Sequence, residues 1–207
     1  MRPARKFEAT VPVHAYISGG MPMKILKGNL ITLEPLCISK HAKGYYEVSQ
    51  DENIHRYSGN SVPSNITDIE KLLNLYEKYF INWMIISNDM QNVIGIIRLG
   101  KPELENGILI AGESEFLSSK YWRKGHMKEA KRLFYEYVFQ ELSVEILYAD
   151  VWEGNTNSMK SLESYGYKLI ETKQEIFSKT GSYTNKYIYA LTRSDYFRSY
   201  QNNPYKA

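Results

Sequence analysis

One amphipathic segment between two strand-like segments limits the folds open to this chain. Residues 125–139 place apolar side chains at the three- and four-residue spacing of a helix face, and these are Met127, Ala130, Leu133, Phe134, Tyr137 and Val138. The charged residues of the segment, Lys131 among them, are expected away from that face. Runs typical of strands precede it at 107–118 and follow it at 145–152. A strand–helix–strand unit joins two parallel strands, so the segment predicts one parallel pair crossed by a helix.

The other periodic segments predict antiparallel strands around this unit. Further strands are expected at 24–36, 82–87, 92–100, 167–178 and 183–192, and further helices at 38–50, 66–80 and about 156–165. A Gly28-Asn29 turn is expected inside the first strand. We therefore expect an α/β fold whose mixed, mostly antiparallel sheet of six to seven strands is flanked by helices, with one central strand–helix–strand crossover.

The chain length of 207 residues favours one domain, expected at residues 23–195. Residues 1–22 are proline-rich and lack any sustained period, which indicates a flexible leader or an expression-derived tail. Residues 196–207 are expected to form a C-terminal tail. The single cysteine, Cys37, cannot form an internal disulfide and is expected as a core thiol in a reducing compartment, so we expect a cytoplasmic protein.

The charge balance does not favour a nucleic-acid partner. There are 26 Lys and Arg against 23 Asp and Glu, a net charge of +3, which is too mild to indicate nucleic-acid binding. No stretch approaches the ~18 uninterrupted apolar residues of a membrane span. We expect no nucleic acid and no membrane as partners, and a monomer or homodimer.

The start of the amphipathic segment has the chemistry of an anion site. Arg123, Lys124 and Gly125 lie where the helix is expected to begin. The first turn of a helix has unpaired N–H groups and the positive end of the helix dipole, which together favour phosphate. Glycine allows a phosphate to approach the backbone closely. This arrangement predicts a pyrophosphate site, although a simple tight turn would have the same sequence.

Polar residues on the two flanking strands are the candidates for catalysis. Glu113 and Glu115 are two residues apart and so lie on one face of a strand. After the second strand, Asn155 and Ser158 open a short helix. His41 and His55 are interpreted as surface histidines, and no clustered His, Cys or carboxylate spacing indicates a metal.

Three motifs in this order resemble the GNAT superfamily of acetyl-CoA-dependent N-acetyltransferases over about residues 24–195. They are "YWRKGHMKEA", "GNTNSMKSLESYGYKLIET" and "YALTRSDY". The first resembles the family's pyrophosphate loop, with Trp122 at its first position and Gly125 at its central glycine. The tryptophan and the second motif are similar to the branch that acetylates the N-termini of ribosomal proteins. The sequence departs from the family at Met127, where a small residue is usual, and at Leu162, where many members have a tyrosine.

The resemblance implies acetyl transfer from acetyl-CoA to an amine by direct attack. It implies Glu115 as the general base, with Glu113 as second choice, and Ser158 as proton donor to the thiolate. The implied CoA-binding residues are Leu117, Ser118, Trp122, Arg123, Lys124, Gly125, His126, Met127 and Asn155. The acceptor stays open among peptide N-termini, amino sugars, antibiotics and other amines. The alternative is an acyl-CoA-binding sensor or interaction module with little catalysis.

Overall fold

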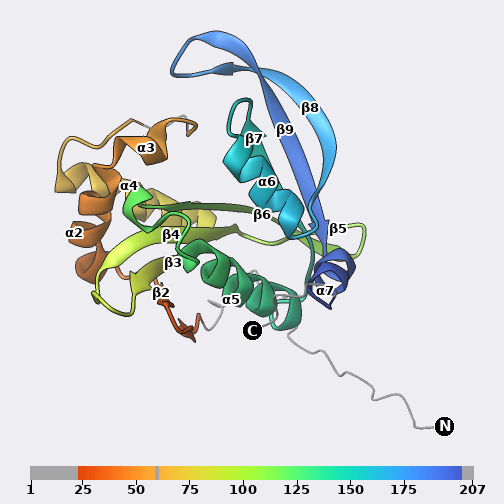
Figure 1. Cartoon of the computed structure of the whole chain (residues 1–207), viewed down its shortest axis with the longest axis horizontal. Coiled ribbons are helices and arrows are strands. Elements are labelled where there is room, and N and C mark those ends of the chain that lie inside the picture. The colour runs from red at the N-terminus through yellow and green to blue at the C-terminus, as the bar shows by residue number, and fades with distance from the viewer. Residues whose placement is uncertain (1–22, 59–60, 202–207) are drawn as a thin grey trace, which may run out of the picture.

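The computed structural model describes residues 23–58 and 61–201 of the chain (Figure 1). The expected leader at 1–22 lies outside the described residues, as does the end of the expected tail. The expected domain limit at 195 falls inside helix α7 (Arg193–Gln201). Tyr196 of this helix is 1% exposed and belongs to the main hydrophobic core. The packed domain therefore continues beyond residue 195.

The described strands form one mixed sheet in the order β1-β2-β3-β4-β6-β7-β9-β8, with β5 paired to β6. Their bounds are β1 Leu26–Lys27, β2 Ile31–Pro35, β3 Phe80–Ser87, β4 Val93–Gly100, β5 Glu103–Glu105, β6 Ile108–Leu117, β7 Val144–Trp152, β8 Lys168–Phe177 and β9 Ser182–Thr192. Every pair is antiparallel except β6 with β7. This confirms the mixed sheet with one crossover. The described residues form nine strands rather than six to seven, because the Gly28-Asn29 turn divides the first strand and the three-residue β5 has no clear sequence pattern.

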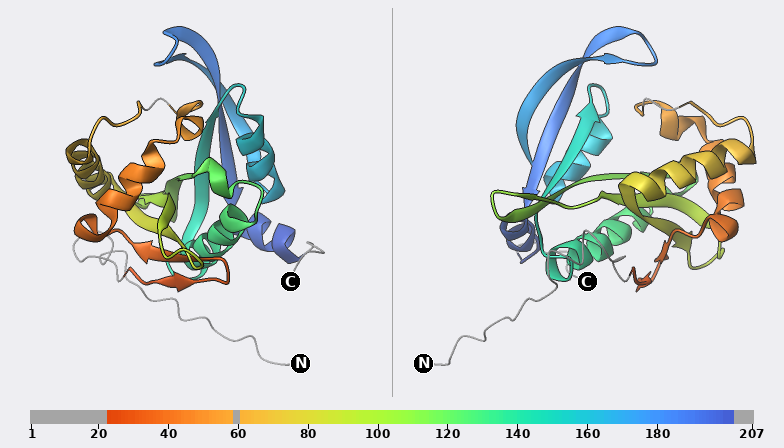
Figure 2. Two further views of the ribbon diagram at one scale, coloured as in Figure 1. Left: turned by 60° about the vertical axis from the view of Figure 1, so that its left-hand side comes forward. Right: turned by 180° about the vertical axis from the view of Figure 1, so that it is seen from behind.

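Helices cover both faces of the sheet (Figure 2). They are α2 Ile38–Ser49, α3 Glu52–His55, α4 Ile66–Tyr79, α5 His126–Gln140, α6 Thr156–Ser164 and α7, with a 3-10 turn at Ser119–Tyr121. Successive side chains of a strand point to opposite faces. Trp83 and Ile97 accordingly pack with Phe134 of α5, whereas Met84 and Ile96 pack under α2 and α4. The two cores hold β3 and β4 rigidly between helix layers.

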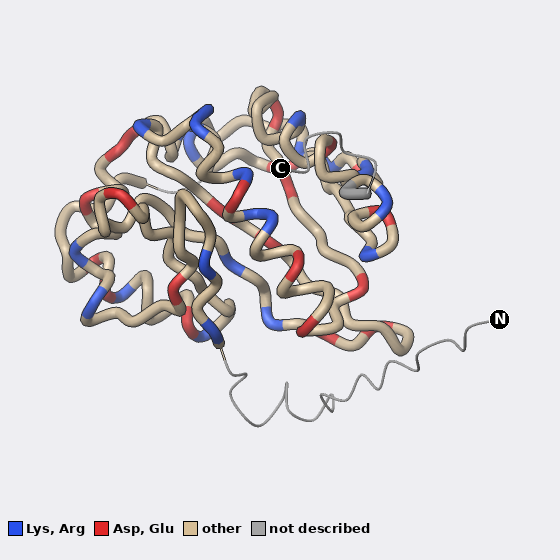
Figure 3. The backbone as a smooth tube through the Cα atoms, turned by 60° about the horizontal axis from the view of Figure 1, so that its bottom comes forward, with Lys and Arg blue, Asp and Glu red and all other residues tan. Residues whose placement is uncertain are grey.

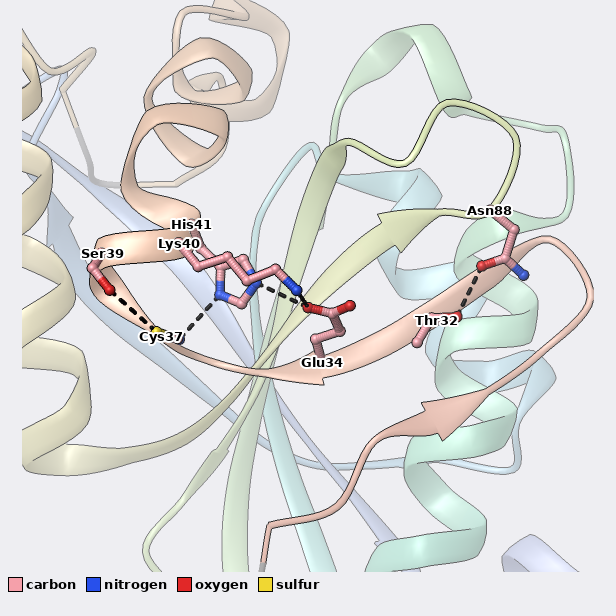
Figure 4. A network of polar contacts seen from close by, with 7 residues as sticks. All are labelled: Thr32, Glu34, Cys37, Ser39, Lys40, His41 and Asn88. Carbon is pink, nitrogen blue, oxygen red and sulfur yellow. Dashed lines mark hydrogen bonds and ion pairs between the residues drawn. The ribbon is translucent and has the colours of Figure 1, made fainter.

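The junction between β2 and α2 buries a histidine that was expected at the surface (Figure 4). The Cys37 N–H donates to His41 Nδ1 (3.0 Å), so the ring proton lies on Nε2, which faces Glu34 (3.1 Å). His41 is 2% exposed, and burial lowers its pKa against the opposing effect of Glu34. His55 is also buried and contacts the Ser49 carbonyl. Cys37, in contrast, is an exposed thiol rather than a core one.

Charged residues of both signs are interspersed along the described chain (Figure 3). Most of the ion pairs join half-exposed groups, such as Lys24 with Glu141 and Arg193 with Glu145. Exposed pairs of this kind contribute little to stability. A buried lysine that faces two glutamates differs from these pairs and belongs to the site described next.

Candidate active site

Strands β6 and β7 separate half-way along their length. They pair in parallel from Leu109 with Val144 to Gly112 with Tyr148 and no further. Beyond this point β6 stays paired with β4 as far as Leu117, and β7 stays paired with β9 as far as Trp152. Figure 1 shows the two strands leaving this point in different directions. The separation opens the centre of the sheet.

The separation leaves one edge of β6 without a strand partner. The Ser118 N–H donates to the Ile94 carbonyl (2.9 Å). Because backbone groups alternate in direction along an antiparallel strand, Glu113, Glu115 and Leu117 direct theirs away from β4. No described strand pairs with this edge, although the Leu117 carbonyl accepts from Trp122 Nε1 (2.7 Å). An extended ligand could therefore pair here as a strand would.

The loop after β6 ends at the uncapped start of α5. Arg123 (φ 58°) and Gly125 (φ 86°) both adopt the left-handed backbone conformation, and Gly125 is the N-cap without any side-chain capping bond. Arg123 and Lys124 are exposed beside it. The other end of the loop is held by Asp51, whose carboxylate accepts from the Ser119 N–H (2.6 Å). The N–H groups of the first α5 turn and two cations thus lie together where the sequence predicts an anion site.

An acidic residue in the first turn of α5 is held away from this anion site. The Glu129 carboxylate accepts from the N–H groups of Asn29, Leu30 and Ile31 at 2.7–3.0 Å. A Cβ added at Gly28 would lie 2.5 Å from the same carboxylate, so a larger residue there would displace the Glu129 carboxylate. These bonds fix α5 to the β1–β2 turn and hold the negative charge of Glu129 against that turn.

A cavity of about 850 Å³ extends through the opening of the sheet. The predicted site residues that line it are Glu113, Glu115, Leu117, Trp122, Arg123, Gly125, Met127, Asn155 and Ser158. Ser118, Lys124 and His126 do not line it. Ser118 and His126 are buried, and His126 packs against Tyr121 with ring centroids 5.1 Å apart. Lys124 is exposed outside the cavity.

The two predicted carboxylates share a buried lysine. Lys131 Nζ lies 2.7 Å from Glu115 and 3.7 Å from Glu113. The side chains of Lys131 and Glu113 are 1% and 0% exposed, whereas that of Glu115 is 17% exposed and reaches the cavity. Burial raises the pKa of Glu113 to about 7, with Lys131 opposing the rise. Burial disfavours charge on Lys131, yet both carboxylates raise its pKa above the usual value, so it stays protonated.

Helix α6 begins at the opposite wall of the cavity. The Asn155 side chain accepts from the Ser158 N–H (3.3 Å), which caps the helix and places Ser158 on the cavity wall. Tyr165 follows this helix but does not line the cavity, and its hydroxyl donates to the Lys128 carbonyl (3.3 Å). Burial raises the pKa of Tyr165 to about 12. Of the two hydroxyl groups, that of Ser158 is the one beside the opening.

Comparison with known families agrees with this geometry. A model of the acetyltransferase (GNAT) domain matches residues 31–168, which is well over half of the chain. The chain belongs to the GNAT acetyltransferase family. It is therefore an acyltransferase enzyme, and its family uses acetyl-CoA.

Two curated proteins resemble this GNAT enzyme in sequence. It is 24% identical over 181 residues to the probable N-acetyltransferase YjcK of Bacillus subtilis, covering 83% of this chain and 98% of YjcK. It is 26% identical over 161 residues to the protein translocase subunit SecA of Prochlorococcus marinus. That match covers 74% of this chain but only 15% of the length of SecA.

Solved structures with the same fold include other acetyltransferases. A GCN5-related N-acetyltransferase from Brucella melitensis has a TM-score of 0.75 at 21% identity, covering 86% of this chain and 82% of that one. Spermidine N-acetyltransferase from Vibrio cholerae, solved with CoA and spermine, has 0.69 at 17%, covering 82% and 99%. The ribosomal-protein-S5-alanine acetyltransferase from Vibrio fischeri has 0.67 at 13%, covering 84% and 99%. Likeness at these identities shows the fold.

Lys131 is the residue of the candidate site whose burial was not predicted from the sequence. It was expected away from the apolar face of α5, but it is 0% exposed. A signal was present, because Lys131 is four residues from Met127 and three from Phe134, on the edge of the apolar face. A charged side chain at such a position is expected to be exposed to solvent unless a counter-ion for it is known. The partners come from β6, so only the tertiary structure provides them.

Two further findings concern the described part of this GNAT chain. None of its helices is long and apolar enough to cross a membrane. Within residues 23–58 and 61–201, no group of three or more His, Cys, Asp or Glu side chains is arranged to hold a metal ion.

The wild type is expected to lose stability as the pH rises from 4.5 to 7, and Glu113→Gln is expected to abolish this loss. In the folded state Glu113 keeps its proton up to about pH 7, whereas the ordinary pKa is 4.5. Because the folded state binds this proton more tightly than the unfolded state, the free energy of unfolding is highest below pH 4.5 and falls as the pH rises from 4.5 to 7. The variant should therefore gain up to about 3 kcal/mol over the wild type across that window.

Urea unfolding of both proteins at several pH values between 4.5 and 8 tests this. Glu136→Gln, which alters a partly exposed glutamate of α5, is the control and should follow the wild-type curve. Parallel curves for Glu113→Gln and the wild type would contradict the buried, protonated state of Glu113.

Proposed function

We propose that this GNAT enzyme transfers an acetyl group from acetyl-CoA to a primary amine by direct attack of the amine on the thioester. The observation that carries the proposal is the free edge of β6, which borders a cavity that ends at the uncapped start of α5. Along one side of this cavity, the free backbone groups of β6 can hydrogen-bond an extended ligand. At its end, the start of α5 can bind an anion. CoA combines an amide-containing arm with a pyrophosphate, so the two features fit its two parts.

The residues proposed to hold CoA lie along this path. The backbone of Glu115 and Leu117 would pair with the pantetheine arm, and one N–H of this edge would polarise the thioester carbonyl. The first turn of α5 with Arg123, Lys124 and Gly125 would hold the pyrophosphate. Bound acetyl-CoA supplies the activated acetyl group. Met127 on the cavity wall narrows the space beside that turn relative to the small residue usual in the family.

Glu115 is the proposed proton acceptor. An α-amine has a pKa near ~8 and a lysine amine near ~10.4, so most acceptors arrive protonated and must lose a proton before attack. Glu115 reaches the cavity and Lys131 holds its carboxylate in place at 2.7 Å. Glu113 also lines the cavity, but its side chain is 0% exposed and its carboxylate accepts from the Tyr135 hydroxyl (2.8 Å), so it is the less accessible of the two. The geometry favours Glu115 over Glu113 as the base.

Ser158→Ala is expected to lower turnover by about tenfold or less while leaving CoA affinity unchanged. Ser158 is proposed to protonate the departing thiolate, but water can replace a lost proton donor and the thiolate is a tolerable leaving group near neutral pH. The Asn155 cap uses the Ser158 N–H, which alanine keeps, so the helix should be unaffected. Steady-state kinetics with thermal melting as a fold control measure this. A drop larger than that of Glu115→Gln would overturn the ranking of the two residues.

Acetyl-CoA turnover across an amine panel, read by thiol release, tests the proposed function. The panel contains peptides with free N-termini, amino sugars, amino acids and polyamines. Peptide substrates would support the ribosomal-protein branch, which the second motif resembles. No thiol release with any amine, together with tight CoA binding, would indicate the sensor role instead. We propose a cytoplasmic location, because a free, exposed cysteine fits a reducing compartment, and we propose a monomer or homodimer.

A further inference from the structure

A row of polar side chains crosses the sheet on the face opposite Glu115. Asn82 of β3 pairs with Arg98 of β4, and Arg98 pairs with Ser114 of β6. Directly paired residues of adjacent strands point to the same face. That face packs under α2 and α4, where its neighbours along the strands are apolar. Three polar residues in such a position need an explanation beyond packing.

Arg98 has no counter-ion among the described residues. Its guanidinium lies over the ring of Tyr76, 4.2 Å from the centroid, and 5.1 Å from that of Phe80. No described carboxylate is within the 4.0 Å of an ion pair, and Arg98 Nε is buried without a hydrogen-bond acceptor. Arg98 is half-buried, so its charge is only partly hydrated, and the ring contacts replace only part of the lost hydration. The arginine is therefore prepared for an anion that comes from outside the chain.

The position of Arg98 links it to the reaction. Arg98, Ser114, Tyr45 and Tyr76 line the same cavity as Glu115 and Ser158. The Ser114 hydroxyl is also buried without a partner. Burial raises the pKa of Tyr45 well above its usual range, so its hydroxyl stays a hydrogen-bond donor. One cavity thus has a carboxylate on the α5 side of β6 and an unpaired guanidinium with hydroxyl donors on the α2 side.

We propose that the acceptor is a small amine that also carries an anionic group, a carboxylate or a phosphate, and that Arg98 and Ser114 bind this group. This inference rests on the proposed function. The fork of a guanidinium matches either group with two parallel hydrogen bonds. Glu115 receives the ammonium end of the same molecule, so the two charges of the acceptor meet opposite charges on the protein. A polycationic acceptor would instead have one amine beside Arg98, which is repulsive.

Matched pairs of amines test this proposal. The pairs are β-alanine with β-alaninamide and phosphoethanolamine with ethanolamine, and each is measured as kcat/KM by thiol release at constant ionic strength. We expect the wild type to prefer the anionic member of at least one pair, and the pair that responds distinguishes carboxylate from phosphate. Arg98→Gln should reduce this preference about ten- to a hundredfold, the range for hydrogen bonds to charged groups. Taking the ratio between variants cancels differences in amine pKa.

Two further variants separate binding from folding. Arg98→Lys keeps the charge but loses the fork and should retain part of the preference. Arg132→Gln removes a partly exposed arginine of α5 that pairs with Glu136 and should retain all of it. CoA affinity and thermal melting report whether each variant is folded.

The outcomes separate failure of the inference from failure of the proposed function. Turnover with no preference for anionic amines, or a preference unchanged in Arg98→Gln, would overturn the anion subsite alone. No turnover with any amine would overturn the proposed function. Calorimetry of phosphoethanolamine and β-alanine with CoA-loaded wild type and Arg98→Gln would still decide on the subsite. Binding weakened at least tenfold by the variant supports it, and equal or absent binding refutes it.

Discussion

Gly125→Glu is expected to weaken CoA binding by at least about a hundredfold. The new carboxylate would stand at the N-cap of α5, where the first-turn N–H groups and the cations of Arg123 and Lys124 are proposed to hold the pyrophosphate. It would satisfy those groups itself and repel the phosphates, and like charges in contact cost several kcal/mol. Isothermal calorimetry with CoA measures the change.

The backbone strain of this substitution needs a matched control, and the chain contains one. Gly107 has nearly the same conformation as Gly125, with φ +83° against +86°, and no atom lies within 4 Å of an added Cβ. Gly107→Glu at the β5–β6 turn should lose similar stability but keep its CoA affinity. Gly125→Ala adds only a Cβ 3.3 Å from the end of the Leu30 side chain and should bind CoA within several-fold of wild type. Wild-type affinity in Gly125→Glu would refute the placement of the pyrophosphate.

Glu115→Gln is expected to lower turnover by about 10²- to 10⁴-fold at neutral pH, the usual effect of removing a general base. The loss should become smaller as the pH rises, because more of the acceptor amine is then already neutral. CoA affinity should be retained, since the proposed pairing uses the backbone of Glu115. Steady-state kinetics from pH 6.5 to 9.5 with a good acceptor, and calorimetry with CoA, test both statements.

The fold should tolerate this substitution because Lys131 keeps a second counter-ion. Glu113 lies 3.7 Å from Lys131 Nζ, and its raised pKa results partly from the charge of Glu115. Without that charge Glu113 ionises more readily and compensates the lysine. Glu113→Gln is the matched variant and should keep most of the turnover. The base assignment fails if Glu115→Gln has wild-type turnover and an unchanged pH profile, or if Glu113→Gln is the more damaged of the two.

Local patterns were sufficient for the order of elements and for part of the site. Alternating and 3.6-residue periods predicted the main strands and helices, including the crossover helix after β6. The glycine and cations at 123–125 predicted an anion site at the start of α5, and the structure brings the free backbone of β6 and Ser158 to the same cavity. Short elements escaped prediction, because the three residues of β5 and the four of α3 are too few to show a period.

The sequence by itself determined most of the longer helices and strands, and which residues open α5. Only the tertiary structure decided which charged groups are buried and with what partners. Lys131 is buried because Glu113 and Glu115 of β6 provide its counter-ions. The Glu129 carboxylate is already hydrogen-bonded because backbone N–H groups of the β1–β2 turn, about 100 residues away in the chain, donate to it. Arg98 is unpaired because no described carboxylate reaches it. Backbone periodicity depends on near neighbours along the chain, whereas burying a charge depends on partners from distant segments.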